Sequence, residues 1–150
     1  MSLVAAHSEL SNILLNDAGL LAWANEHFNK GIEGINGNVA IEDIDVRSMP
    51  VLGFELVDGT STPEVGNESQ LSEPGFELFF GWQESDPQKA FFQRLELVDL
   101  MIEALMKNST LNGAVSGAWV SKWIPDRNSN PMGRFMNFNI DMYYEALNDD

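Results

Sequence analysis

Two histidines are the only imidazole side chains in the sequence that could act as a base or ligate a metal. His7 and His27 lie 20 positions apart in the N-terminal segment, a spacing that offers no shared metal site. His27 follows Glu26 in a helical pattern, and we interpret it as a residue at the boundary of a helix. The sequence predicts no catalytic or metal-binding role for either histidine.

Two neighbouring carboxylates, Asp43 and Asp45, lie in a segment that alternates like a strand. In a strand both would project from one face, where they could bind a cation. Neither the spacing of an EF-hand loop nor a third oxygen ligand accompanies them. We therefore interpret them as part of a solvated strand face.

Three evenly spaced glycines, Gly31, Gly34 and Gly37, resemble a phosphate-binding loop in composition. Phosphate loops run from a strand into a helix N-terminus, whereas this segment runs from a predicted helix to a predicted strand. We interpret it as a flexible connection.

Other patterns that carry chemistry are missing from the sequence. The chain has no cysteine, which removes disulfides, thiolate nucleophiles and sulfur-ligated zinc and favours an intracellular protein. The Walker, Gly-x-Ser-x-Gly and His-Glu-x-x-His patterns do not occur. We expect no cofactor, no metal and no enzyme activity. No apolar run approaches the ~18 residues of a membrane span.

Apolar residues at helical intervals predict a helix, or a pair of helices, over residues 7–30 with Ser8 as the N-cap. Asp17 and Gly19 indicate a break near its middle. Asp86-Pro87 predicts the start of a central helix. We expect this helix to be buried on most of its circumference, along a face that carries Phe91, Leu95, Val98, Ile102 and Leu105.

Alternating apolar residues predict about five strands, at residues 39–46 (with a bulge), 52–56, 76–82, 119–124 and 136–144. The last strand is expected to bury one face and to expose the other. The buried face is predicted to consist of Met136, Phe138, Ile140, Met142 and Tyr144.

Two polar segments separate these strands. Residues 59–74 are predicted to form a long acidic loop, and residues 125–133 the polar tip of a hairpin. The result is a single α+β domain over residues 1–150, in which a mixed or antiparallel sheet of about five strands is packed by the N-terminal helix region and the central helix. The four tryptophans, Trp23, Trp82, Trp119 and Trp123, are predicted to fill the core, with one of the last two left open as a contact anchor.

The charge of the chain is strongly negative and uneven. The formal net charge is −15, and residues 40–86 supply −10 of it, whereas residues 117–134 carry +2. Binding to nucleic acid is disfavoured, because it requires a basic footprint. The acidic surface is predicted to include Glu42, Asp43, Asp45, Glu64, Glu68 and Glu73.

The order of these segments resembles that of the tail terminator (tail completion) proteins of long-tailed bacteriophages and prophages. An N-terminal helix leads to acidic strands around Pro50-Val51, and the central helix runs into the sequence NSTLNGAV at residues 108–115. The chain then closes with Trp119 and a strand that ends in Met142-Tyr143-Tyr144. The acidic insertion at 59–74 departs from the shortest members of that family.

The resemblance implies a structural protein without an active site, which forms a ring, usually of six copies, on the finished tail tube. Its partners would be further copies of itself, the tail-tube proteins and the head–tail connector proteins. It would lie in the bacterial cytoplasm during assembly and then in the virion tail. No membrane partner and no sequence-specific nucleic acid binding are expected.

In such a ring the basic hairpin would contact the acidic region of the next subunit. The predicted contact residues are Lys122, Asp126, Arg127 and Arg134. Two alternatives remain open. An acidic DNA mimic would carry carboxylates along a whole face, and a small-molecule enzyme would have a deep pocket with convergent polar groups.

Overall fold

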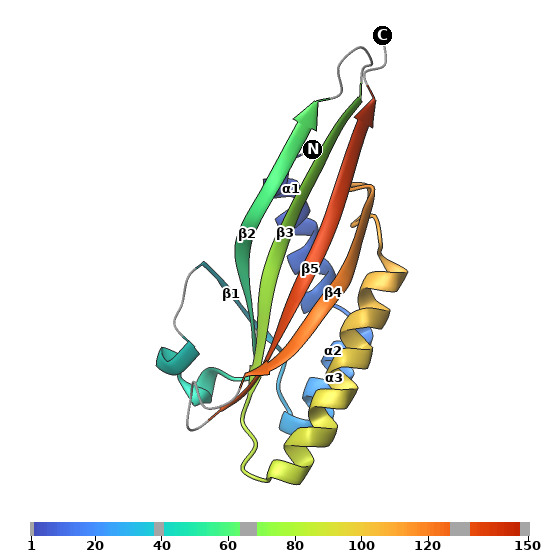
Figure 1. Ribbon diagram of the computed structural model, residues 1–150. Coiled ribbons are helices and arrows are strands. Elements are labelled where there is room, and N and C mark those ends of the chain that lie inside the picture. The colour runs from blue at the N-terminus through green and yellow to red at the C-terminus, as the bar shows by residue number, and fades with distance from the viewer. Residues whose placement is uncertain (1, 38–40, 64–68, 127–132, 148–150) are drawn as a thin grey trace.

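The computed structural model describes residues 2–37, 41–63, 69–126 and 133–147 (Figure 1). Within these ranges, only the backbone is described for residues 41, 58–63, 69–74 and 145–147. The helices and strands are α1 Leu3–Leu15, α2 Ala18–Phe28, β1 Glu33–Asn36, β2 Val51–Pro63, β3 Ser69–Trp82, α3 Pro87–Lys107, β4 Gly117–Asp126 and β5 Arg134–Leu147.

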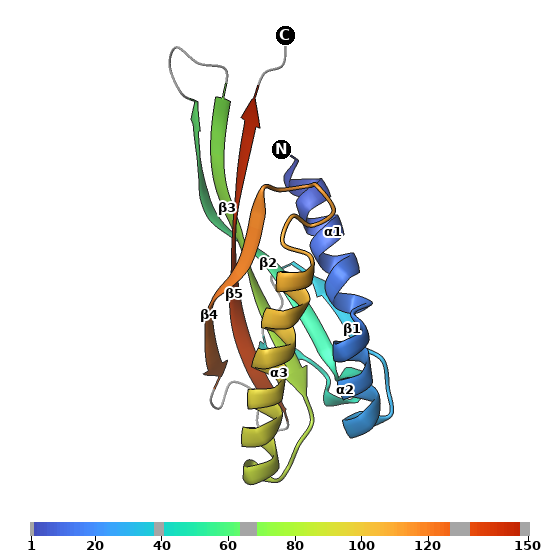
Figure 2. The ribbon, with the colours of Figure 1, turned by 90° about the vertical axis from the view of Figure 1, so that its right-hand side faces the viewer.

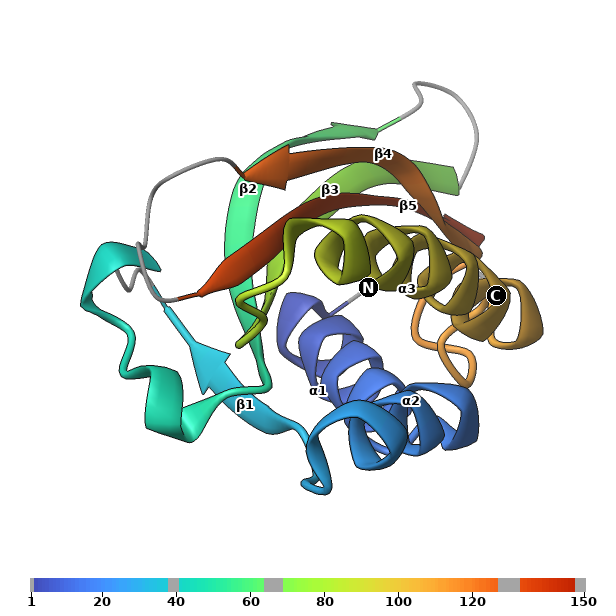
Figure 3. The ribbon, with the colours of Figure 1, turned by 90° about the horizontal axis from the view of Figure 1, so that it is seen from below.

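The five strands form one mixed sheet in the order β1-β2-β3-β5-β4. β1 pairs with β2 in parallel, and the other neighbours are antiparallel. All three helices pack on one face of the sheet (Figures 2 and 3), and the main hydrophobic core lies between these two layers. The predicted α+β class, with a sheet of about five strands, is confirmed.

The N-terminal region forms two helices, as the predicted break requires. Asp17 is the N-cap of α2, and its Oδ2 accepts a hydrogen bond from the Leu20 backbone N–H at 3.0 Å. The predicted cap at Ser8 is wrong, because the first helix starts earlier. Ser2 caps α1, and its Oγ accepts from the Ala5 backbone N–H at 3.1 Å.

The start of α3 is confirmed, but the face that it buries is only partly the predicted one, through Leu105 and the partly buried Val98. The side chains that face the core come from Ala90, Gln93, Leu97, Met101, Ala104 and Leu105. Phe91 and Leu95 of the predicted face are about half exposed. The small side chains of Ala90 and Ala104 allow the helix to approach the sheet closely, so this stripe faces inward and the aromatic stripe faces solvent.

Asp86 stabilises the first turn of α3. Its Oδ1 accepts from the backbone N–H groups of Gln88 at 2.9 Å and of Lys89 at 3.5 Å. We expect Asp86→Ala to lower the free energy of unfolding by about 1 kcal/mol, because two orphan donors lose their acceptor. Urea unfolding of this variant beside Asp99→Ala, an exposed carboxylate within the same helix, measures the difference. Equal losses in the two variants would contradict a capping role.

The strand predicted at residues 39–46 is wrong. Residues 38–40 lie outside the described ranges, and short 3-10 turns occupy Ile41–Asp43 and Val46–Ser48. Ile41 and Ile44 are three positions apart, which suits a 3-10 turn and not a strand. Ile44 packs in a second, small cluster on the other face of the sheet, together with Met49, Val51, Phe79 and Phe135.

The segment predicted as a glycine-rich connection contains β1. This strand lies beside the lower part of β2, and its register pairs Glu33 with Val51 and Asn36 with Phe54. At Gly34 an added Cβ would lie 2.8 Å from Leu15 Cδ1. The absence of a side chain at Gly34 leaves room for the Leu15 side chain between β1 and α1.

The long loop predicted at residues 59–74 is also wrong. β2 continues to Pro63 and β3 starts at Ser69, and the register pairs Thr60 with Glu73 and Pro63 with Gln70. Backbone pairing in a hairpin does not depend on apolar side chains, so the polar sequence concealed these strands. Residues 64–68 lie outside the described ranges.

The C-terminal half follows the prediction more closely. The turn after α3 has left-handed backbone conformations at Asn112 and Gly113, with φ of 56° and 89°. β5 buries Met136, Phe138, Ile140 and Met142, as predicted, while Tyr144 is half-buried. No helix in the described ranges is both long enough and apolar enough to cross a bilayer.

Candidate functional site

The two histidines pack in separate places. His7 Nε2 lies 2.9 Å from Asn36 Oδ1, and its ring contacts Phe54 edge-on. The ring centroid of His27 lies 5.2 Å from that of Trp23, and its Nε2 lies 3.6 Å from a carboxylate oxygen of Glu96. Both imidazoles connect a helix to a neighbouring element, and neither lies beside the other.

Asp43 and Asp45 do not share a strand face. Asp43 ends the first 3-10 turn, and Asp45 caps the second. The Arg47 side chain forms hydrogen bonds with both Asp45 carboxylate oxygens, at 2.9 to 3.2 Å. These bonds, with one from the Arg47 backbone N–H, lower the pKa of the Asp45 carboxyl and raise the pKa of the Arg47 guanidinium. The pair is a local turn contact on the surface.

One hollow of about 460 Å³ is lined mainly by polar side chains, between the end of α2 and the start of α3. The residues around it are Glu26, His27, Glu84, Asp86, Gln88, Lys89, Phe92, Gln93 and Glu96. Several of these groups bond to one another or to the backbone. Asp86 caps α3, and Glu84 Oε1 accepts from Gln93 Nε2 at 2.8 Å. Among the residues that the structure describes, no group of three acidic or histidine side chains is arranged to hold a metal ion. Several polar groups around the hollow are therefore engaged in structural bonds.

The predicted contact residues differ in their exposure and in their bonds within the subunit. Lys122 is exposed on β4, whereas Asp126, at the end of β4, is half-buried and has an interaction of its own. Arg134 is half-buried, and its Nε donates to the Glu84 backbone carbonyl at 2.9 Å. Part of its guanidinium therefore supports the start of α3 from within the subunit. Arg127 lies outside the described residues.

The predicted acidic surface is only partly described. Glu42, Asp43 and Asp45 are exposed around the 3-10 turns, on the side of the sheet where β1 lies (Figure 1). Glu73 belongs to β3, opposite Thr60. Glu64 and Glu68 lie outside the described residues.

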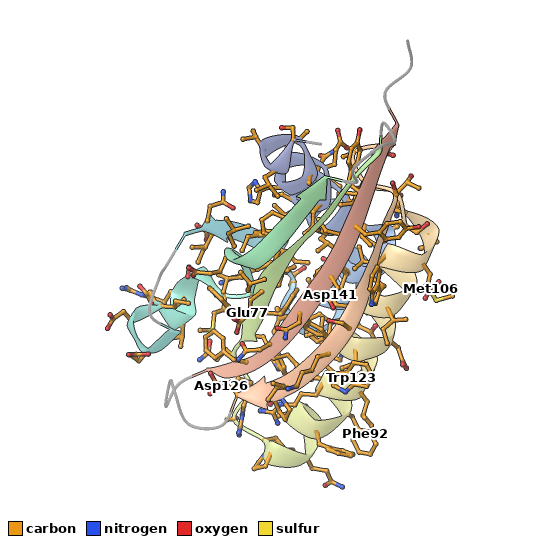
Figure 4. The ribbon with its side chains drawn as sticks, turned by 45° about the horizontal axis from the view of Figure 1, so that its top comes forward. Glu77, Phe92, Met106, Trp123, Asp126 and Asp141 are labelled. Atoms are coloured by element: carbon orange, nitrogen blue, oxygen red, sulfur yellow. The ribbon has the colours of Figure 1, made fainter. Side chains whose placement is uncertain are left out.

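An exposed apolar surface at the opposite edge of the sheet was not predicted. We call it the α3–β4 surface and define it by Phe91, Phe92, Leu95 and Trp123, all of them large side chains that are 48–55% exposed. The rings of Phe91 and Phe92 contact each other with centroids 5.4 Å apart. Phe92 and Trp123 lie on this side of the molecule in Figure 4.

A shallow groove of about 290 Å³ runs through the α3–β4 surface. Phe91, Leu95 and Val98 form its helix side, and Trp123 and Pro125 form its strand side. Exposed apolar patches of this kind mark interaction sites in soluble proteins. The sequence held the signal in a second helical stripe, Ala90, Gln93, Leu97, Met101 and Ala104, which competes with the aromatic stripe for the core.

The tryptophans divide between core and surface. Trp23 and Trp82 are buried, and Trp82 Nε1 donates to Gln93 Oε1 at 2.8 Å. Trp119 and Trp123 are 46% and 48% exposed. The core prediction is therefore confirmed for the first two and wrong for the β4 pair. Side chains alternate between the two faces of an edge strand, and the helix layer covers only part of one face.

The face of the sheet that the helices leave uncovered carries acidic side chains beyond the small apolar cluster of Val51, Phe79 and Phe135. Glu55 of β2 pairs with Glu77 of β3, which in turn pairs with Asn139 of β5. Glu77 and Asp141 are exposed and lie on this face in Figure 4. Like charges directly opposite each other destabilise a strand pair, so this face carries an electrostatic cost within the subunit.

A scan against protein-family models and a search of curated proteins gave no match to this chain.

Proposed function

We propose that the chain is a structural subunit of a bacteriophage or prophage tail, which assembles into a ring that terminates the tail tube and joins it to the head. The α3–β4 surface carries the proposal, because four large apolar side chains gather at one edge of the sheet. Their burial in a subunit contact would contribute about 25 cal/mol for each Å² removed from water.

A ring needs two different surfaces on opposite sides of each subunit. The α3–β4 surface lies at the β4 edge, with Lys122 exposed on the same strand. The opposite edge carries the exposed acids Glu33, Glu42 and Asp43 on and beside β1. Opposite charges on the two edges favour head-to-tail association over pairing of like edges.

The uncovered acidic face supports a role around DNA. The helix layer is the bulkier layer, so in a ring it takes the wider outer circumference, and the uncovered face lines the channel. Glu55, Glu77 and Asp141 then repel DNA phosphates and leave DNA free to pass along the wall.

An acidic DNA mimic is the competing proposal, and the uncovered acidic face favours it. A mimic needs carboxylates at phosphate-like positions along one face, but it has no use for an exposed apolar surface at the sheet edge. Competition with DNA for a nuclease or repressor tests this alternative.

Electron microscopy of the purified chain tests the ring. We expect closed rings of uniform diameter with a central channel. Single particles of subunit size at every concentration, together with competition against DNA, would overturn the ring in favour of the mimic.

A further inference from the structure

Among the residues that the structure describes, backbone is unpaired on both edges of the sheet. β4 is the last strand in the order and pairs with β5 alone. Within the described ranges, β1 covers β2 from Val51 to Phe54, and residues 55–57 and 60–63 of β2 pair with β3 alone. Unpaired strand edges of this kind are templates for the addition of another chain.

The two unpaired edges run in opposite directions. β2 is antiparallel to β3, β3 to β5, and β5 to β4, so β4 runs opposite to β2. When two copies are placed side by side in the same orientation, β4 of one copy lies antiparallel to β2 of the next. This arrangement continues the antiparallel pattern of the sheet from copy to copy.

Residues that pair with one another across successive strands lie at one level of the sheet. At one such level the two edges carry opposite charges. Glu55 pairs with Glu77, Glu77 with Asn139, and Asn139 with Lys122. Within the described residues neither glutamate forms an ion pair. Lys122 of a neighbouring copy would reach Glu55 from its unpaired side and relieve the repulsion between the two carboxylates.

Apolar residues share the next levels of the sheet. Val57 pairs with Gly75, Gly75 with Asp141, and Asp141 with Trp119 on β4. Trp119 and Val57 are therefore at one level on opposite edges, and both are exposed. Leu56 is 57% exposed on the helix side of β2, at the level of Val120 of β4. Addition of the strand would cover these side chains together.

The part of β4 that follows Lys122 is not open to pairing with β2 of another copy. Pro125 lies on this part of β4, and a proline is a typical device that protects an edge strand. The register shift between Val120 and Lys122 lies inside residues 117–122, so the added strand would carry a bulge between Trp119 and Lys122. Ile124 lies at the level of Gly53, where β1 already covers the edge of β2. The two edges are thus open to each other only above β1.

We propose that residues 117–122 of β4 add to the unpaired half of β2 in the next copy, with Lys122 beside Glu55 and Trp119 beside Val57. The proposal rests on the proposed ring function and defines the contact that joins the subunits. The partner is a second copy of this chain.

Disulfide cross-linking tests the contact, because the chain has no cysteine of its own. Cysteines opposite each other in antiparallel strands lie within disulfide range, whereas positions three strands apart in one subunit do not. We expect Glu55→Cys with Lys122→Cys to give a ladder of covalent oligomers on oxidation. One exposed ion pair contributes little to the stability of a contact, so the assembly survives the substitution.

The control is Glu77→Cys with Lys122→Cys, which moves one cysteine a strand inward from the edge. We expect at least a tenfold smaller cross-linked fraction from this pair. Native mass spectrometry of the unmodified chain separates the two proposals. Oligomers of the unmodified chain, without a ladder from the Glu55→Cys and Lys122→Cys double variant, overturn the strand addition and leave the ring in place. A monomer without a ladder overturns both.

Discussion

Phe91→Ser combined with Trp123→Ser is expected to leave the fold intact and to weaken self-association by roughly a hundredfold or more. Both side chains are about half exposed in the subunit and line the groove of the α3–β4 surface. Aromatic anchors of an interface typically contribute about 2 kcal/mol or more each, and about 1.4 kcal/mol corresponds to a tenfold change in Kd. Sedimentation or light scattering over a concentration series measures the change.

Met106→Ser is the matched control for this variant. Met106 is a large, exposed apolar residue on the same helix, and it lies further along α3 from Phe92 (Figure 4). We expect it to change the Kd by less than about threefold, because a side chain outside the contact contributes little. Equal effects of the control and the double variant would contradict the assignment of the α3–β4 surface as a contact.

Gln93→Leu is expected to lower the free energy of unfolding by about 2 kcal/mol, although leucine is close to glutamine in size. Gln93 is 4% exposed, accepts from Trp82 Nε1 and donates to Glu84 Oε1, each at 2.8 Å. The substitution leaves the indole N–H buried without an acceptor, a loss of about 1–3 kcal/mol. The corresponding fall in Tm is roughly 4–8 °C for a chain of this length.

Gln88→Leu provides the comparison, because Gln88 is exposed in the first turn of α3. It is expected to change the free energy of unfolding by less than about 0.5 kcal/mol. Thermal and urea unfolding of both variants measure the difference. A Gln93→Leu protein as stable as the parent would show that the bond between Gln93 and Trp82 does not stabilise the core.

The parts of the fold that the sequence predicted are those in which local rules and burial agree. Asp86-Pro87 sets the start of α3, and strict alternation sets the buried face of β5. The missed parts lack that agreement. β1 and the outer halves of β2 and β3 are polar or contain glycine. They become strands through backbone pairing: β1 with β2, the outer halves of β2 and β3 with each other, and β3 also with β5. Such pairing leaves no periodic trace in the sequence.

The candidate surface could be predicted only in part. The difference in charge between residues 40–86 and residues 117–134 can be counted from the sequence, and it indicated Lys122 as a basic contact residue. The apolar surface depends on which of two stripes of α3 faces the sheet. Ala90, Leu97 and Ala104 decide that choice through close packing, which a count of apolar residues does not reveal. Arg134 looked like a surface contact residue, yet its Nε bonds to the backbone of Glu84, and only the three-dimensional arrangement brings these two segments together.

Native mass spectrometry of the purified chain over a concentration series tests the central claim most directly. The subunit has a mass of 16.7 kDa, and we predict a single closed oligomer at a whole-number multiple of that mass. Its population should grow with concentration and shrink when Phe91 and Trp123 are replaced. A subunit mass at every concentration would contradict the claim that this protein acts by assembly.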